Sequence, residues 1–304
     1  MADQMRGRVL ARRRHRGRGL AVVAAVAAVA AAAAVTIYPN GPFRSHRAAS
    51  SPAPLVSVVP GSAPAATIVL DRMAVAAGAS STITVGPDQW FYIKEESEYA
   101  NETTSPWTMQ PMTVRETWYG QQSGQPSMYR QDGQDTPMTA AVPAGGGANP
   151  ATEVGINHPT YAWVRSLPTS PARLLQVVYR ASAVEGESKG YTAFQAIGDL
   201  LTSAVLPPAT EAALYRATAL IPGVVFIPDV TDAAGRDGFG IALTDQWGER
   251  HEWIFATTTY EYLGERDYQV RATVGAKAGT LVGLSAVLGR GAANSLGGTP
   301  ALIP

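Results

Sequence analysis

The sequence predicts an α+β domain, in which a curved antiparallel β-sheet, half-barrel-like, packs against three to four helices and is preceded by one transmembrane helix. Apolar residues recur at helical spacing between residues 171 and 221, whereas residues 223–288 hold short apolar runs separated by polar turns. A charge-free run of 19 residues near the N-terminus has the length of a membrane span. Along the chain, the predicted elements come as one helix, then strands, then helices and then strands again. This order predicts that the helices pack against one sheet.

The N-terminal region divides into three segments. Residues 1–19 carry seven arginines, and residues 20–38 read LAVVAAVAAVAAAAAVTIY. As a helix, the second segment would span roughly 28 Å, and the preceding arginines place the N-terminus in the cytoplasm and the main domain outside the cell. A cleaved secretory signal and an Ala-rich soluble helix remain alternatives. Six prolines in residues 39–64 predict a semi-extended linker to the domain at 65–304.

Caps and breakers delimit the predicted elements of the domain. Ser170 is a good N-cap and Pro171 suits the first helical position, while Pro207 ends one helix and starts the next. Aromatic and β-branched runs bounded by turn residues predict strands. The predicted helices cover 65–77, 171–183, 191–206 and 207–221, and the predicted strands cover 89–99, 112–119, 126–131, 223–230, 239–246, 251–256, 262–270 and 280–288.

Composition excludes several classes of chemistry. The chain has no cysteine, so disulfides, thiolate nucleophiles and Cys-based zinc sites are excluded, and it has only four histidines. Seven of the 24 basic residues and one of the 24 acidic residues lie in residues 1–38, which leaves 17 basic and 23 acidic residues in the remainder. A mildly acidic domain is a poor partner for nucleic acid, and we expect none.

The stretch WGERHEWIFATTTYEYLGER begins like the zinc-protease signature H-E-x-x-H at His251-Glu252. That signature needs a helix, and its fifth position here is Phe255. The stretch is predicted as a strand, on which His251 shares a face with Trp253 and Phe255, while Glu252 shares the other with Ile254. We therefore predict no metal site and no cofactor.

Other candidate sites are weak. The carboxylates of Glu95, Glu96, Glu98 and Glu102 could bind calcium, but a solvated sheet edge explains them better. Ser285 in GLSAV lacks the second glycine of a nucleophile elbow, so we predict no catalytic residue and no enzyme. Aromatic side chains could line an apolar groove or belong to the core. The residues of this candidate groove are Trp90, Tyr92, Trp118, Trp253 and Phe255.

Several stretches carry a family resemblance. RLLQVVYR, AFQAIGDLLTSAVLPPATEAALYRATALIPGV, VTDAAGRDGFGIAL and HEWIFATTTYEYLGER resemble an uncharacterised family of actinobacterial single-span membrane proteins, commonly encoded near extracytoplasmic-function sigma factors. The resemblance covers most of residues 65–288, although the family usually has a longer segment before the span. The element order is also similar to that of periplasmic lipoprotein-carrier and sigma-regulator domains, an analogy of layout from which function does not follow.

The sequence thus predicts a membrane-anchored extracytoplasmic binding or sensor module, held by residues 20–38, for a protein or a lipid-like ligand. The family resemblance implies regulation of an envelope-stress sigma pathway. An envelope hydrolase with a non-sequential active site and a purely structural envelope protein are the alternatives. If the apolar segment is cleaved, the domain is instead secreted.

Overall fold

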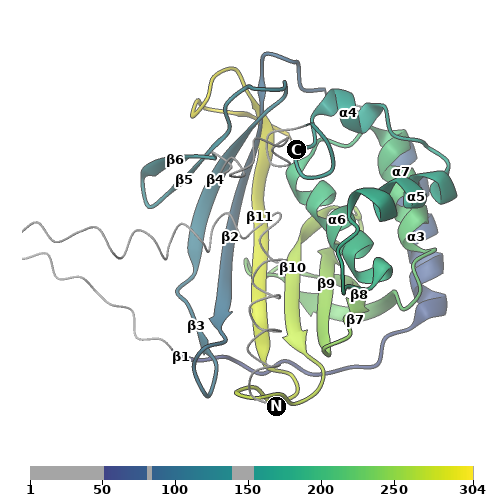
Figure 1. The fold of residues 1–304 in the computed structure, drawn as a ribbon, viewed down its shortest axis with the longest axis vertical. Helices are drawn as coiled ribbons and strands as arrows, with labels where there is room; N and C mark the ends of the chain where they lie inside the picture. Colours follow the sequence, from purple (N-terminus) through teal and green to yellow (C-terminus); the bar gives the residue numbers. More distant parts are fainter. Residues whose placement is uncertain (1–50, 81–83, 139–153, 304) are drawn as a thin grey trace, which may run out of the picture.

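The computed structural model describes residues 51–80, 84–138 and 154–303 (Figure 1). The predicted basic segment and the predicted membrane helix, residues 1–19 and 20–38, lie outside this part of the chain. None of the described helices is both long and apolar enough to cross a bilayer.

The helix ends lie close to the predicted ones, although Ser170, the predicted N-cap, makes no side-chain capping hydrogen bond. Four predicted helices are confirmed, with ends shifted by a few residues, and a short fifth helix was not predicted. Pro171 occupies the first turn of its helix as expected, and Ser62 caps another by accepting a hydrogen bond from the backbone N–H of Ala65. The helices are α3 (Ala63–Gly78), α4 (Tyr161–Arg165), α5 (Pro171–Ala181), α6 (Lys189–Ser203) and α7 (Pro208–Thr218).

The strands form one open antiparallel sheet in the described part of the chain. Its main order is β6-β5-β4-β2-β11-β10-β9-β8-β7, with β3 beside β2, β1 beside β3, and β12 beside β11. The sheet therefore has edges and does not close into a barrel. The strands are β1 (Ser51–Pro52), β2 (Trp90–Asn101), β3 (Thr108–Met109), β4 (Thr113–Gly120), β5 (Met128–Gln131), β6 (Gln134–Pro137), β7 (Val225–Thr231), β8 (Asp237–Thr244), β9 (Glu249–Phe255), β10 (Tyr262–Gln269), β11 (Leu281–Ala293) and β12 (Ala301–Ile303).

The helices pack on one side of the sheet, toward its β7 edge, and β4, β5 and β6 extend beyond them (Figure 1). We call this side of the sheet the helix-facing side. The main core lies here, and its centre is the Phe194 ring of α6, stacked on Trp253 of β9 at 3.8 Å between ring centroids and 6° between planes. Phe255 lies in the same layer, in edge contact with Tyr215 of α7. Burial of these large aromatic surfaces is the main stabilising contribution of the layer.

The opposite side of the sheet is covered in part by residues 51–62, which run along the strand ends at the bottom of Figure 1. The N–H of Val56 donates to the carbonyl of Gly279 (2.8 Å), and the N–H of Ser62 donates to that of Phe226 (3.0 Å). Val59 packs near a small apolar cluster that includes Ile254. Residues that the sequence assigns to the linker are therefore part of the folded sheet, and we call residues 51–62 the strap.

A bulge in β10 rearranges its side chains. Pairing with β9 shifts between Tyr262 and Gly264, and Gly264 has φ of +157°. A side chain there would meet the carbonyl oxygen of Ser285 at 2.2 Å, so the neighbouring strand tolerates only glycine. The extra residue lets Tyr262 and Glu265, three positions apart, both reach the helix-facing side, where the hydroxyl of Tyr262 donates to Oε1 of Glu265 (2.6 Å).

Candidate functional site

The predicted apolar groove is divided between the two sides of the sheet. Trp253 and Phe255 lie in the helix-facing core, with 1% and 0% of their surface exposed. Tyr92 and Trp118 pack together on the opposite side, with partly buried Trp90 against them. The indole N–H of Trp118 donates to the carbonyl of Gly298 (3.0 Å). The structure therefore does not bring the five aromatic residues into one groove.

The acidic run in β2 is also divided. β2 lies between β4 and β11 and is not an edge strand, which differs from the expectation. Because its side chains alternate, Glu95 points to the helix-facing side, whereas Glu96 and Glu98 point to the other. Glu102 lies beyond the end of the strand.

Four carboxylates from different elements gather on the helix-facing side. Glu95 of β2, Asp199 of α6, and Glu265 and Asp267 of β10 are each partly exposed, and we call them the acidic cluster. The Tyr99 ring lies near Glu95, Glu265 and Asp267, and burial among these charges raises the pKa of its hydroxyl.

The acidic cluster is electrostatically strained. Burial, followed by the charges of Asp267 and Asp199, raises the pKa of Glu265 to about 8. Burial raises the pKa of Asp199 to about 7. Burial also raises the pKa of Glu95, although Arg115 and Arg290 oppose it. Because burial disfavours the ionised form, Asp199 and Glu265 hold protons near neutral pH, or would bind a cation in their place.

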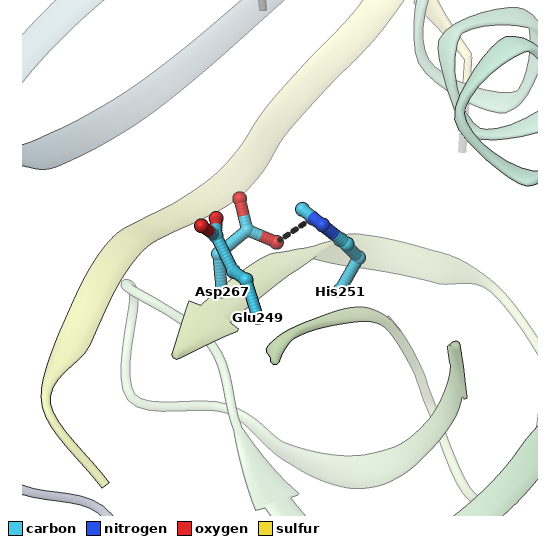
Figure 2. A group of neighbouring side chains, drawn as sticks. All are labelled: Glu249, His251 and Asp267. Carbon is cyan, nitrogen blue, oxygen red and sulfur yellow. Dashed lines mark hydrogen bonds and ion pairs between the residues drawn. The ribbon is translucent and has the colours of Figure 1, made fainter. Parts of the chain in front are cut away.

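His251 lies beside this cluster and is held by acids on both sides of its ring. Its Nδ1 lies 3.1 Å from Oδ1 of Asp267, and its Nε2 lies 3.7 Å from Oδ2 of Asp245. Burial alone lowers the pKa of His251, but the charge of Asp267 and the nearby Asp245 raise it to about 10. In Figure 2 the Glu249 carboxylate approaches that of Asp267 close to the imidazole.

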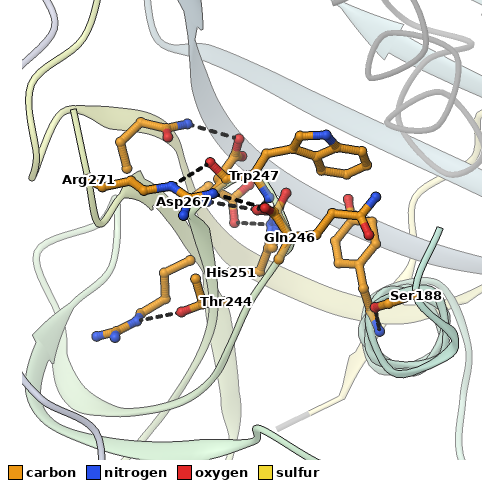
Figure 3. Close-up of polar contacts among 12 residues, drawn as sticks. Ser188, Thr244, Gln246, Trp247, His251, Asp267 and Arg271 are labelled. Carbon is orange, nitrogen blue, oxygen red and sulfur yellow. Dashed lines mark hydrogen bonds and ion pairs between the residues drawn. The ribbon is translucent and has the colours of Figure 1, made fainter. Parts of the chain in front are cut away.

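The turn between β8 and β9 fixes the position of His251 (Figure 3). Asp245 accepts hydrogen bonds from the N–H groups of Trp247 (2.9 Å) and Glu249 (2.8 Å). The guanidinium of Arg271 donates to the carbonyls of Gln246 (2.9 Å) and Trp247 (3.2 Å). Hydrogen bonds to Asp245 and from Arg271 therefore hold the backbone of this turn in place, and His251 follows it on β9.

Alternation on β9 is as expected from the sequence. His251 shares the helix-facing side with Trp253, while Glu252 is fully buried on the other side of the sheet. There its Oε2 accepts hydrogen bonds from Nε (2.9 Å) and Nη2 (2.7 Å) of Arg266, and its Oε1 accepts one from the Tyr268 hydroxyl (2.8 Å). Glu252 thus has a structural role and does not share a site with His251.

A pocket of about 490 Å³ lies away from this chemistry. Its polar lining includes Gln121 and Arg165, and the Gln121 side chain accepts a hydrogen bond from the N–H of Tyr161 (2.8 Å). Because no carboxylate or imidazole of the described residues lines it, we place the candidate site at the acidic cluster.

Comparisons with known proteins identify no family for this chain. No protein-family model matches it, and no curated protein matches it. Among solved structures, it is similar to the complex of MucA and MucB from Pseudomonas aeruginosa, with 12% sequence identity and a TM-score of 0.29. The match covers 78% of this chain and 59% of that chain. A likeness at this level carries no argument about function.

Several residues of the candidate site could not be identified from the sequence. Asp199 reads as an ordinary polar position on an amphipathic helix, and Glu265 lies on the helix-facing side only because of the bulge at Gly264. Asp267 did carry a signal, since it occupies an alternating position in the predicted strand 262–270, whereas Glu249 lies in the predicted turn before the strand 251–256 and carried none. Ser285 lies within β11, where its Oγ accepts a hydrogen bond from the N–H of Glu265 (3.1 Å), and it does not form a nucleophile elbow.

Proposed function

We propose that the protein is a membrane-tethered extracytoplasmic binding module, and that the acidic cluster binds a cationic segment of a protein partner. The observation that carries this proposal is the gathering of four carboxyl groups from β2, α6 and β10 in one place. Asp199 and Glu265, on α6 and β10, have pKa values raised toward neutrality by burial. A lysine or arginine side chain placed between them would favour their ionised forms and would be attracted by them in return.

Three further observations favour a basic protein segment over a lipid-like ligand. The aromatic residues from which an apolar groove was predicted are mostly buried and lie on two sides of the sheet. Around the acidic cluster the side chains are instead Tyr99, Tyr119 and Arg115, of types that are enriched at protein interfaces. The excess of acidic residues after residue 38 would also attract a basic partner over a longer distance.

The proposal also includes a membrane anchor at residues 20–38 and a role in an envelope-stress sigma pathway. Residues 20–38 would anchor the chain, with residues 1–19 in the cytoplasm and the described domain outside. A role in an envelope-stress sigma pathway is what the sequence resemblance to the actinobacterial single-span family implies. Fractionation of cells that produce the full-length chain with a C-terminal tag tests the anchor. Recovery of a shortened, soluble chain would instead indicate a cleaved signal.

A peptide titration tests the binding site. Full-length protein is titrated into a fluorescent Lys/Arg-rich peptide and into an acidic peptide of equal length, at low and at high salt. We expect saturable binding of the basic peptide alone, weakened by salt because charged groups carry it. The double variant Glu95→Gln/Asp199→Asn should lower the affinity about tenfold, since each lost ion pair contributes about 0.5–1 kcal/mol.

The control is Asp135→Asn, which removes one charge from β6 at the far end of the sheet. It should leave peptide affinity unchanged. Equal binding of both peptides, or equal affinity in the double variant and the wild type, would refute the acidic cluster as the binding site. Saturable binding of a hydrophobic probe without peptide binding would favour a lipid-like ligand.

A further inference from the structure

Four side chains from two neighbouring strands meet at the acidic cluster, with which they share Asp267. On β9, Glu249 and His251 are two residues apart and point to the helix-facing side. In the register of the sheet, His251 lies opposite Asp267 of β10, and Glu249 lies opposite Gln269. These two cross-strand pairs form a compact group that we call the quartet. Because it stands on paired strands, its geometry is held by the backbone ladder.

The quartet is almost completely buried. Glu249 is 1% exposed, His251 3% and Gln269 0%, and only the side chain of Asp267 reaches solvent, at 19%. The Tyr191 ring of α6 covers the imidazole, with 5.1 Å between the ring centroids. Buried carboxylates of this kind are costly unless a cation or hydrogen-bond donors compensate them.

Two polar atoms in this group have no hydrogen-bond partner among the described residues. One is Oε1 of Gln269, although its Nε2 donates to Oε2 of Glu249 (3.3 Å) and so holds the amide against the carboxylate. The other is Nε2 of His251, which forms an ion pair at 3.7 Å with Oδ2 of Asp245 rather than with Asp267, so the Gln269 oxygen is the atom that bears on the group. A buried amide oxygen without a donor is unfavourable, whereas the same oxygen is a good ligand for a metal ion.

The donor set fits one class of ion. Ligand atoms of Glu249, His251 and Asp267 lie within 4.8 Å of one another, and the Gln269 amide adds an oxygen. Around an ion with bonds of about 2.0–2.2 Å, tetrahedral ligand atoms lie roughly 3.4 Å apart, so a small inward shift would close the group. Two carboxylates balance a double positive charge, and an imidazole selects transition metals over magnesium and calcium.

We propose that the quartet of Glu249, His251, Asp267 and Gln269 binds one divalent transition-metal ion, with zinc as the ion that fits best. All four ligands come from the protein, so the site would be a closed, structural one that joins β9 to β10 beneath α6. This inference goes beyond the proposed function, because it concerns a different ligand and depends on residues that the peptide test leaves intact. The opposing explanation is a self-contained charge network in which a proton on His251 takes the place of the metal.

A zinc titration decides between these two explanations. Full-length protein is stripped with EDTA and dialysed, and then titrated with zinc chloride and, separately, with magnesium chloride by calorimetry. The unfolding temperature is measured with and without each ion. We expect one tight zinc site per chain, a higher unfolding temperature with zinc, and no effect of magnesium, because a ligand that binds the folded state stabilises it. The absence of zinc-dependent stabilisation would overturn the proposal without any variant.

Three variants locate the site. Glu249→Gln should weaken zinc binding at least a hundredfold, and Asp135→Asn, the same kind of charge loss at the far end of the sheet, should leave it unchanged. Gln269→Glu should destabilise the metal-free protein, because it places a second carboxylate against Glu249, yet bind zinc at least tenfold more tightly. Unaltered binding in Glu249→Gln, or weaker binding in Gln269→Glu, would show that zinc binds elsewhere.

Discussion

Gly198 is the position where α6 comes closest to the sheet, and its replacement by alanine tests the packing of the site. A Cβ atom there would lie 2.6 Å from Nε1 and 3.1 Å from Cε2 of Trp253, and 3.2 Å from Oε1 of Glu265, where ordinary contacts are 3.4–4 Å. Trp253 cannot move aside, because it is 1% exposed and stacked on Phe194 at 3.8 Å. The new methyl group therefore has to displace the helix or distort the tryptophan.

Two opposing effects set the size of the change. Alanine in a helix interior is favoured over glycine by about 1 kcal/mol, whereas overpacking a dense core costs about 1–3 kcal/mol. A contact as short as 2.6 Å against a fixed ring places Gly198→Ala at the upper end of that cost. We expect the free energy of unfolding to fall by about 1–2 kcal/mol, measured by urea denaturation of the full-length chain.

Gly78→Ala is the matched control, because Gly78 is also helical and its added Cβ would lie 3.9 Å from that of Ala212, an ordinary contact. It should be neutral, or stabilising by up to about 1 kcal/mol. If Gly198→Ala proves as stable as the wild type, the reasoning that Trp253 is held fixed against α6 is refuted.

Two further predictions concern charges. Glu252→Gln should destabilise the protein by about 3–5 kcal/mol in urea denaturation, because it leaves the guanidinium of Arg266, which is only 14% exposed, without its charge partner. Asp135→Asn, which breaks an exposed pair with Arg130, should cost less than about 1 kcal/mol, and similar losses for both variants would contradict this reasoning. Burial raises the pKa of Glu265 from 4.5 to about 8. Between these two pH values the folded state binds more protons than the unfolded state, so the contribution of Glu265 to stability declines as the pH rises through this range. The free energy of unfolding, measured from pH 5 to pH 8, should therefore decline less steeply with pH in Glu265→Gln than in the wild type. Identical slopes in the two proteins would show that Glu265 titrates normally.

Local signals in the sequence were enough for most elements of the fold. Caps and breakers such as Ser170 and Pro207 set the helix ends to within a few residues, and aromatic or β-branched runs located the longer strands. The strands β1, β3, β6 and β12 and the helix α4 were missed because each has only two to five residues, too few for a periodic pattern.

The candidate site was harder to predict, for two physical reasons. Alternation places residues on the same face of one strand, as it did for His251 and Trp253, but it does not reveal which face the helices cover. The aromatic residues of β2 and β9 consequently seemed able to share a groove that the sheet does not form. A bulge inverts the alternation after it, so the direction of Glu265 depends on one extra residue at Gly264.

The strap also determines how a mechanical load would enter this domain. Anything that pulls on the chain before Ser51 acts first on β1, which is joined to β3 by two paired residues, and then on the bonds at Val56 and Val59 in succession. These hydrogen bonds would break one after another before any force reaches α3 and the aromatic core. Tension on the N-terminal chain would thus expose Ile254 and the apolar side chains around it while the helix-facing side stayed intact.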